Sequence, residues 1–583
     1  MSYILKFRRL FIPILVFVAS VAQAATYSGT VPVMFINTEN NAAITSKENY
    51  LNATYYLDPM GCEGVEALGS FNEQLPLEIR GRGNYTWNGF NKKPYRLKFA
   101  AKTAIMGMNK SKHFALMANA DDELSGLRNA VGYELARMLG MPWTPSAKPV
   151  EVVLNGDYIG LYFLTETVRV DSDRVNVVEQ ADGETDPLAI TGGWLVEIDN
   201  YDSDPHVRIT EGNGARIIFT YKTPEELSSQ QEQFLRTQME NIDDAIYTKD
   251  KNSTKWEEYI DLDQLVRFYI VQEILDNAES FHGSCYMSRE KGEHEKWKFG
   301  PVWDFGNTFR RGTGQFIYEN PPYGQTWIGE IAKFPRFQER VKEVWKELLE
   351  NNFSDIYTYI DNYVSSYELA IQADDHRWPD YGSQNVAGDG STMKNKIRER
   401  VSFLSEHWGS VQLPPSETSY NVYFTTEGTS WSQVYVYSWE HSNGQTVKFL
   451  GDWPGTRTTD KVEIDGEEYY RMTFDLGYTP FEPMIIFNDG KSGVGEHQTE
   501  DLVLENNAMY NVFGKIGLHT SLNKVEEKLS FTVDHLTIRA QGAIALYNLQ
   551  GILVASGNDV LKAPCQGVYI VRHNNCHTTI VLR

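Results

Sequence analysis

The chain has 583 residues, more than the roughly 250 to 300 at which a single hydrophobic core stops growing, so we expect at least two domains. Its formal net charge of -24 at pH 7 excludes nucleic acid and anionic membranes as main partners, because neutralising phosphates requires clustered Lys and Arg. Aromatic residues make up 13% of the chain, a richness that is common where sugars are bound by stacking.

The first residues have the pattern of a secretory signal peptide. Three cations in MSYILKFRRL precede the apolar stretch FIPILVFVASVA, and small residues surround the expected cut. This stretch is shorter than the ~20 residues of a spanning helix, which favours a signal peptide over a membrane anchor. We therefore expect a signal peptide over residues 1–24 and a mature chain, from Ala25, that is secreted or held at the outer-membrane surface and has no transmembrane span.

The chain has only four cysteines, so disulfides do not define its fold. Cys565 and Cys576 are close enough in sequence to pair across a hairpin. Free or buried thiols are the alternative that the sequence leaves open for these two residues.

Residues from about 26 to 100 alternate polar and apolar positions in short runs, which predicts half-buried strands. In DDELSGLRNAVGYELARMLG the apolar residues recur at helical spacing, and Gly140 is typical of a helix end. Asn155-Gly156 lies between two β-branched and aromatic runs, which predicts a hairpin. The segments GGWLVEIDN and ARIIFTYK predict further strands.

Helical periodicity dominates residues 224–280 and 334–408, with a predicted strand pair in CYMSREKGEHEKWKFG between them. Strands followed by helices predict an α+β domain over residues 25–409, built as two lobes with a cleft.

Proline and small polar residues at 410–419 predict a linker. Beyond it, short strands separated by turn residues predict an all-β sandwich over residues 420–515. Residues 524–583 again alternate polar and apolar positions, which predicts a small β-rich C-terminal domain.

Several polar features of the first domain are candidate site residues. EIRGRGNYTW places Arg80 in a glycine-rich turn, where backbone amides can approach a phosphate, although such turns are commonly just hairpins. On the next strand, alternation puts Arg96 and Lys98 on one face, which is either a phosphate-binding face or a solvated edge. Two acids, Glu279 and Asp304, follow downstream across a probable hairpin.

Asp304 lies between the bulky rings of Trp303 and Phe305 in KFGPVWDFGNTF, which predicts a buried carboxylate. A buried carboxylate needs hydrogen bonds, a cation or a metal. Capping of a turn by Asp304 ahead of Gly306 is the alternative.

The order of these parts, a glycine-rich turn, a basic strand, a helix and two separated acids, is that of a protein kinase. The motifs LEIRGRGNYTW, KKPYRLKF, HFALMANADDELSGLRNAVGYELARMLGM, VEVVLNGDYIGLYFLTETVRVDSDRV and FGPVWDF together closely resemble the CotH family of secreted atypical kinases, over roughly residues 31–408.

The resemblance implies that Asp304 binds the metal of ATP with Mg or Mn. It also implies that Arg80 and Lys98 lie near the nucleotide phosphates, and that Glu166 lines the nucleotide side of the cleft. Glu279 stands where the family usually has its catalytic aspartate, one methylene longer, and near-attack geometry is sensitive to a displacement of about 1 Å. Many members carry a second acid two residues after the metal-binding aspartate, where this chain has Gly306.

The predicted sandwich resembles the starch-binding modules of carbohydrate-binding family 26, through NVYFTTEGTSWSQVYVYSW, GDWPG and IIFNDGKSG. Planar aromatics bind the apolar faces of pyranose rings by excluding water. Tyr435 and Tyr437 share one strand face and Trp453 precedes a Pro-Gly turn, so these three are the candidate glucan-binding residues. Filling of the sandwich core is their alternative role.

The last segment, with LYNLQGILVASG and GVYIVR, is similar to C-terminal sorting domains of the type IX secretion system, which implies export in a Bacteroidetes-like organism. A small adhesive sandwich fits the same strands.

Two hypotheses of function follow. The first is an exported atypical kinase that transfers the ATP γ-phosphoryl group to a protein and is tethered to starch-like glucan. The alternative is a catalytically inactive surface protein with a kinase fold that binds starch or another polysaccharide. The replacement of the second acid by Gly306 and of the aspartate by Glu279 favours the alternative, because phosphoryl transfer depends on positioned charge.

Overall fold

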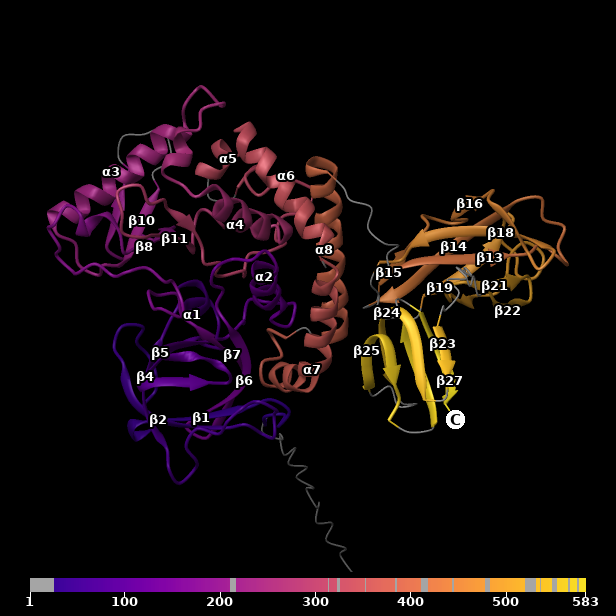
Figure 1. Ribbon diagram of the computed structural model, residues 1–583, viewed down its shortest axis with the longest axis horizontal. Helices are drawn as coiled ribbons and strands as arrows, with labels where there is room; N and C mark the ends of the chain where they lie inside the picture. Colours follow the sequence, from indigo (N-terminus) through magenta and orange to yellow (C-terminus); the bar gives the residue numbers. More distant parts are fainter. Residues whose placement is uncertain are drawn as a thin grey trace, which may run out of the picture. The chain divides into compact units, whose positions relative to one another are not determined.

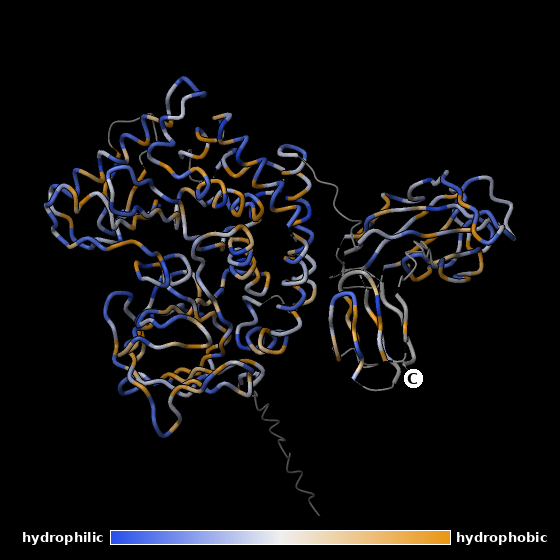
Figure 2. Tube along the Cα trace, viewed as in Figure 1, coloured by the Kyte–Doolittle hydropathy of each residue, from blue (hydrophilic) through white to orange (hydrophobic). Residues whose placement is uncertain are grey.

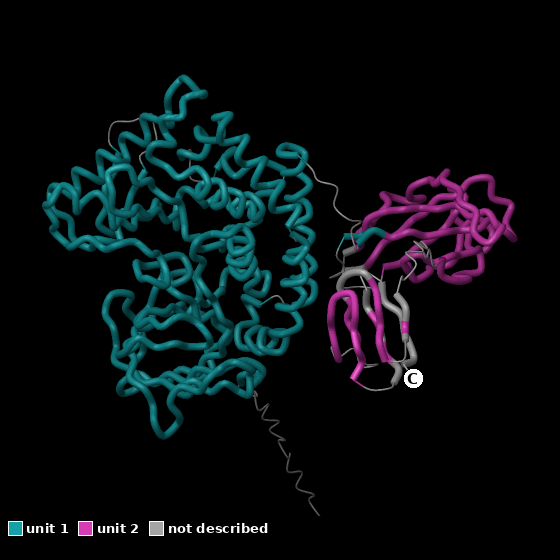
Figure 3. Tube along the Cα trace, in the orientation of Figure 1, with its two compact units in different colours: residues 1–419, 476–481 teal, residues 420–475, 482–583 magenta. Residues whose placement is uncertain are grey.

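The structure is a computed structural model in which the chain divides into two compact units, residues 1–419 with 476–481, and residues 420–475 with 482–583 (Figure 3). It describes residues 26–209, 217–312, 314–321, 326–351, 353–382, 385–409, 418–442, 445–477, 483–519, 531–534, 536–547, 553–564, 567–573 and 576–582. The predicted signal peptide, most of the predicted linker and Cys565 lie outside these residues.

The first seven strands close into a barrel in the order β1-β2-β3-β4-β5-β7-β6 (Figure 1). All neighbours are antiparallel except β1 and β6, which pair in parallel and close the barrel. Inward-facing side chains such as Ile79, Leu97 and Phe114 fill it. Its strands are β1 (Val33–Thr38), β2 (Leu51–Asp58), β3 (Leu75–Gly81), β4 (Tyr95–Ile105), β5 (Met108–Met117), β6 (Ala147–Leu154) and β7 (Asp157–Glu166).

A second, antiparallel sheet follows in the order β12-β11-β8-β10-β9, and helices pack around it. Its strands are β8 (Trp194–Asp199), β9 (His206–Arg208), β10 (Ile218–Thr223), β11 (Cys285–Arg289) and β12 (Lys298–Phe299). The helices of this unit are α1 (Tyr85–Gly89), α2 (Leu127–Met138), α3 (Ser229–Ile246), α4 (Leu262–Ile274), α5 (Trp327–Ile331), α6 (Pro335–Glu350), α7 (Asp355–Arg377) and α8 (Val386–Trp408), with short 3-10 turns at Glu39–Asn41, Ala189–Thr191 and Lys255–Glu258.

The predicted α+β class is confirmed, whereas closure of the N-terminal strands into a barrel was not foreseen. The Asn155-Gly156 hairpin joins β6 to β7, with both turn residues at positive φ, and α2 ends just before Gly140. The barrel and the helix-covered sheet have separate hydrophobic cores, and Figure 2 shows hydrophobic segments along the barrel strands and through the helices around α4. The kinase-like character of these two parts stays a prediction.

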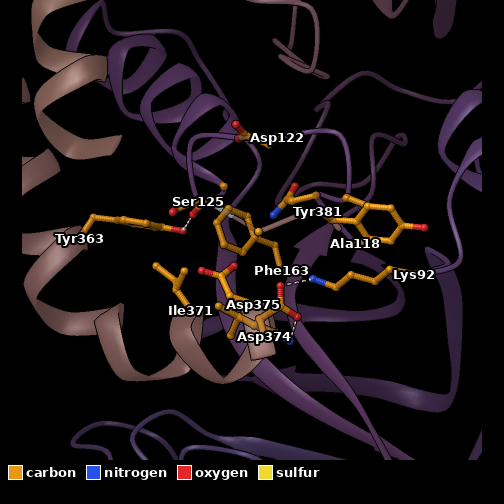
Figure 4. A pocket seen from close by; sticks show the side chains of 15 residues that line it. Lys92, Ala118, Asp122, Ser125, Phe163, Tyr363, Ile371, Asp374, Asp375 and Tyr381 are labelled. Atoms are coloured by element: carbon orange, nitrogen blue, oxygen red, sulfur yellow. Dashed lines mark hydrogen bonds and ion pairs between the residues drawn. The ribbon is translucent and has the colours of Figure 1, made fainter. Parts of the chain in front are cut away.

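Helix α7 is fastened to the barrel by a buried ion pair beside a cavity of about 40 Å³ (Figure 4). Asp374 accepts hydrogen bonds from the Lys92 ammonium (2.6 Å) and from the main-chain N–H of Leu161 on β7 (2.8 Å). The Tyr363 hydroxyl, also on α7, donates to the carbonyl of Ser125 ahead of α2 (2.9 Å). These contacts join a late helix to the first strands.

A second buried ion pair ties α4 to α8. The Arg400 guanidinium donates to the Glu273 carboxylate (2.6 Å) and to the Glu273 carbonyl (2.8 Å), and neither side chain is exposed. The main-chain N–H of Ile317 also donates to the Glu273 carboxylate (3.2 Å). A carboxylate taken fully out of water requires such donors, so this pair holds the end of α4 in place.

The second unit contains two five-stranded sheets in the predicted sandwich region and a third sheet near the C-terminus. The first two have the orders β17-β18-β13-β21-β22 and β15-β14-β19-β20, with β16 paired to β14. Their strands are β13 (Ser419–Phe424), β14 (Val434–Ser442), β15 (Gln445–Lys448), β16 (Thr456–Thr458), β17 (Lys461–Ile464), β18 (Glu467–Asp475), β19 (Met484–Asn488), β20 (Leu502–Val503), β21 (Ala508–Asn511) and β22 (Gly514–Leu518). The third sheet contains β23 (Phe531–Asp534), β24 (Thr537–Tyr547), β25 (Leu553–Lys562), β26 (Gly567–His573) and β27 (Cys576–Leu582).

Across the described ranges, no helix combines the length and apolar character needed to cross a membrane.

Replacing Arg400 by Met is expected to destabilise the first unit by about 3 to 5 kcal/mol, because it leaves the Glu273 carboxylate buried without its cation. Calorimetry would register this as a lower melting temperature for that unit's transition. The control is Lys346→Met, which removes an exposed pair with Glu350 and should change stability by less than about 0.5 kcal/mol. Equal effects of the two changes would contradict the assignment.

Candidate functional site

Asp304 lies in the loop after β12, between two rings that belong to the large core. Trp303 and Phe305 are buried, and the Phe305 ring fits because α2 carries Gly132, where a Cβ would lie 2.3 Å from that ring. Asp304 itself is exposed, with a left-handed φ of 57°. The predicted burial of Asp304 was therefore wrong, because the chain turns at this residue and only its two neighbours enter the core.

Three carboxylates from separate segments meet at this loop, and we call Asp121, Glu279 and Asp304 the acidic group. Burial raises the pKa of Asp121 to about 6, and the charge of Asp304 is the next largest cause. Burial also raises the pKa of Glu279 to about 7, again with Asp304 as the second cause and with a contribution from Asp121. The charge of Asp304 thus opposes the ionisation of both Asp121 and Glu279.

Hydrogen bonds hold the loops of the acidic group together. The side-chain amide of Asn277 donates to the main-chain carbonyl of Asp304 (3.4 Å), and the Asn129 side chain of α2 accepts the N–H of Phe305 (3.0 Å). The Asn307 amide donates to the Glu279 carboxylate. Asp304 accepts the N–H of Gly306 (3.3 Å), so the turn-capping role weighed from the sequence is present alongside an exposed carboxylate.

Arginines from β3, β4 and the turn between them lie close to one another, and we call Arg80, Arg82 and Arg96 the arginine group. Arg82 is the member that approaches the acidic group, because its guanidinium lies 5.7 Å from the centre of the ring of Trp303, next to Asp304. Burial lowers the pKa of Arg82, while Asp304 is the largest influence that raises it. Arg80 and Arg96 are register partners on the outer face of the barrel, and each has a buried Nε without a hydrogen-bond partner. Burial lowers the pKa of Arg96, and Arg80 and Arg82 lower it further. Guanidinium N–H donors that lack a partner and lie among other positive charges favour the binding of an anion.

The other two residues predicted to lie near a nucleotide are placed less directly. Lys98 forms an ion pair with Glu78 (2.8 Å) in which both side chains are about 40% exposed. Glu166 is buried at the end of β7, where one carboxylate oxygen accepts the N–H of Ser146 (3.0 Å) and the other has no hydrogen-bond partner. Burial lowers the pKa of Arg174, which the Glu166 carboxylate raises and the charge of Arg96 lowers further. Glu166 is therefore connected to the arginine group only through Arg174.

The predicted glucan-binding aromatics lie on one side of β14. Val436 between them is buried in the sandwich, while Tyr435 and Tyr437 are half-buried and Trp453 is 37% exposed. The Tyr437 ring lies 5.5 Å from the Trp453 ring and 5.2 Å from the Trp439 ring, centroid to centroid. Asn488, at the end of β19, is fully buried and donates to the Pro454 carbonyl, so it is not exposed to a ligand on this side.

A family model described as CotH kinase protein matches residues 79–404, more than half of the chain and all of the acidic and arginine groups. The chain belongs to this CotH kinase protein family. The matched region begins near the end of β3 and ends within α8, so it covers the later barrel strands and the helix-covered sheet. We call the barrel and the helix-covered sheet together the CotH domain.

A second family model, starch-binding module 26, matches residues 422–503, which contain the aromatic side of β14. A solved structure of a family CBM26 module from Eubacterium rectale Amy13K, in complex with maltoheptaose, is also similar. The similarity has 16% identity and a TM-score of 0.13, covers 28% of this chain and 87% of that one, and carries no structural argument. No curated protein matches the chain. Neither family model reaches the C-terminal sheet, so the type IX sorting domain stays a prediction.

The sequence did not indicate Asp121 or Asn307 as site residues, and Arg82 had no predicted role although it lies in the glycine-rich motif. Asp121 is one of two consecutive aspartates ahead of α2, and nothing in the sequence distinguishes it from Asp122. Asn307 directly follows the VWDFG motif, and this position is the only sequence feature that could have indicated a role in the site. Arg82 stands two residues after Arg80 in the same glycine-rich turn.

The residues present fit a metal-bound nucleotide. Among the residues that the structure describes, no three His, Cys, Asp or Glu side chains are arranged to hold a metal ion by themselves. A magnesium ion that arrives with a nucleotide does not need such a set, because it takes most of its ligands from phosphates and water and only one or two from carboxylates. An exposed Asp304 carboxylate with the Arg82 guanidinium nearby matches that requirement.

Glu279→Gln is expected to stabilise the CotH domain at pH 8 by up to about 3 kcal/mol and to have no effect at pH 4. The folded-state pKa of Glu279, about 7, lies above its ordinary 4.5, so ionisation costs the folded state stability as the pH rises through this range. Melting temperatures measured between pH 4 and 8 would reveal the widening difference. The exposed Glu66→Gln should leave the wild-type curve unchanged, and parallel curves for wild type and Glu279→Gln would contradict the prediction.

Proposed function

We propose that the chain is an exported, ATP-dependent atypical protein kinase whose family 26 module holds it on starch-like glucan. The observation that carries the proposal is the approach of Arg82 to Asp304. The Arg82 guanidinium lies 5.7 Å from the centre of the ring of Trp303, the residue before Asp304, and Asp304 is the largest influence that raises the pKa of Arg82. Cations that bind phosphate beside carboxylates that bind a divalent metal are the parts that phosphoryl transfer requires.

When bound, ATP with Mg²⁺ or Mn²⁺ supplies the γ-phosphoryl group and the charge of the metal. Asp304 would hold the metal, and the guanidinium groups of Arg80, Arg82 and Arg96 would neutralise phosphate oxygens. Glu279 would act as the general base, accepting the proton of the acceptor protein's hydroxyl as that oxygen replaces ADP on the γ-phosphorus. A pKa near 7 suits this general base at neutral pH, because it combines an available carboxylate with useful basicity.

The hydrogen bonds around Glu279 support this role despite its extra methylene. Asn200 and Asn307 both donate to its carboxylate, from β8's loop and from the loop of Asp304. A donor on each oxygen fixes the orientation of the side chain, which positions the base before substrate arrives. Catalysis by Glu279 in place of the aspartate then depends on the acceptor hydroxyl lying correspondingly farther away.

The module is proposed to bind glucan through Tyr437 and Trp453, with Tyr435 extending the same face. Their rings pack against one another at the surface instead of filling the core, so their faces remain available to the apolar faces of glucose units. Attachment to an extracellular polymer agrees with the signal peptide expected over residues 1–24. We propose that the protein is secreted or held at the outer-membrane surface.

Addition of ATP with Mn²⁺ is expected to raise the melting temperature of the CotH domain in the full mature chain, because a ligand stabilises the fold that binds it. Asp304→Ala should abolish the rise and Arg96→Met should reduce it, whereas Lys98→Met, which removes a pair with Glu78, should reduce it less. The exposed Asp380→Ala serves as the matched control. A wild-type protein without any rise would favour the inactive, polysaccharide-binding alternative.

The full mature chain is expected to be retarded in native gels that contain amylopectin. Tyr437→Ala or Trp453→Ala should each weaken binding by about tenfold, since losing one aromatic contact costs about 1.4 kcal/mol, and the double variant should migrate freely. Phe513→Ala removes a ring that is 87% exposed between β21 and β22, on the other sheet, and should not alter migration. An unretarded wild type would remove the glucan proposal.

A further inference from the structure

Gly306 has no carboxylate of its own, but the carboxylate of Asp121 lies close to it. The family resemblance implies a second carboxylate at this position, and the chain has none there. A Cβ built on Gly306 would lie 2.8 Å from a carboxylate oxygen of Asp121 and 3.5 Å from one of Asp304. The carboxylate of Asp121 therefore occupies the place where a side chain from residue 306 would project.

Asp121 is held there by its main chain, which leaves its carboxylate directed at this place. Arg128 and Arg310 donate to the main-chain carbonyl of Asp121, at 3.2 and 2.8 Å. The following residue, Asp122, has a different task, because its carboxylate accepts the N–H groups of Leu124 and Arg128 (both 3.0 Å) at the start of α2. The two consecutive aspartates thus divide into one that caps the helix and one that faces Asp304.

A buried hydroxyl gives independent support for a ligand at this place. Tyr133 of α2 is 2% exposed, and its hydroxyl has no hydrogen-bond partner. Its ring lies between those that flank Asp304, 6.4 Å from Trp303 and 5.9 Å from Phe305. Asp304 and Arg82 are the charges that most influence it. A hydroxyl buried without a partner costs roughly 1 to 3 kcal/mol, so a bound group that accepts its hydrogen bond would relieve a real penalty.

We propose that Asp121 is the second metal-binding carboxylate of the CotH domain and that it holds, with Asp304, the divalent cation chelated by the nucleotide. This inference rests on the proposed function and adds a ligand to its site. Two carboxylates and phosphate oxygens form the oxygen-rich set that Mg²⁺ and Mn²⁺ prefer. The acid missing from residue 306 is supplied from the segment ahead of α2, so the loss of the motif residue does not remove the metal site.

The test measures binding of Mn²⁺ to the full mature chain with ATP, by the electron paramagnetic resonance of free Mn²⁺ and by the melting temperature. Asp121→Asn keeps the shape of the side chain and is expected to weaken Mn²⁺ binding by at least tenfold. Glu123→Gln removes the same charge two residues away, from an exposed side chain that pairs with Arg128 and Arg310, and should bind as wild type does.

A transfer of the acid tests the geometry directly. Gly306 is not among the glycines with positive φ, so an aspartate is allowed there once Asp121 is shortened. In Asp121→Ala/Gly306→Asp, residue 306 supplies the carboxylate that residue 121 has lost. Mn²⁺ binding should therefore recover to within about threefold of wild type.

The outcomes separate this inference from the proposed function. If wild type and Asp121→Asn bind Mn²⁺ with ATP equally well, the assignment of Asp121 is overturned while the kinase proposal stands. If wild type binds no Mn²⁺ with ATP, both are overturned. Asp121→Asn could also lose binding because it is less stable, which a lower melting temperature without ligand would reveal. In that case Asp121→Ala/Gly306→Asp decides: if this variant is folded and does not recover Mn²⁺ binding, the inference is overturned.

Discussion

The site depends on holding like charges together. Asp121, Glu279 and Asp304 come from three segments, and burial together with mutual repulsion raises the pKa values of the first two. Such a group persists only where a rigid structure enforces it and cations stand nearby. Arg82 supplies a positive charge near Asp304, and Arg128 and Arg310 contact the main chain of Asp121. A divalent metal would add further compensation.

The rest of the CotH domain supplies that rigidity. Both rings beside Asp304 enter the core, and Gly132 of α2 leaves the space that Phe305 fills. Asn277 joins the loop of Glu279 to the loop of Asp304, and the ion pair of Glu273 with Arg400 fixes the helix from which Asn277 follows. Because the flanking rings and the Glu273–Arg400 pair are buried, the loop that carries the exposed Asp304 carboxylate is anchored in the core.

Local patterns predicted the local structure, whereas contacts between distant segments could not be read from them. Helical spacing located α2, and Asn155-Gly156 located the β6–β7 hairpin. Closure of the barrel needs the parallel pairing of β1 with β6, which no periodicity encodes. The burial expected for Asp304 failed for a related reason: two bulky neighbours indicate a nearby core, but the backbone turn at Asp304 decides which side chains enter it.

Asp121 and Asp122 make the same point about function. They are identical and adjacent, yet Asp122 caps a helix and binds Arg128 while Asp121 faces Asp304 across the space left by Gly306. A motif written along the chain records Gly306 as a lost ligand. A metal ion responds only to the oxygens around it, whichever segment carries them, so the spatial neighbourhood of Asp304 is the better guide to whether this family member retains a metal-binding kinase site.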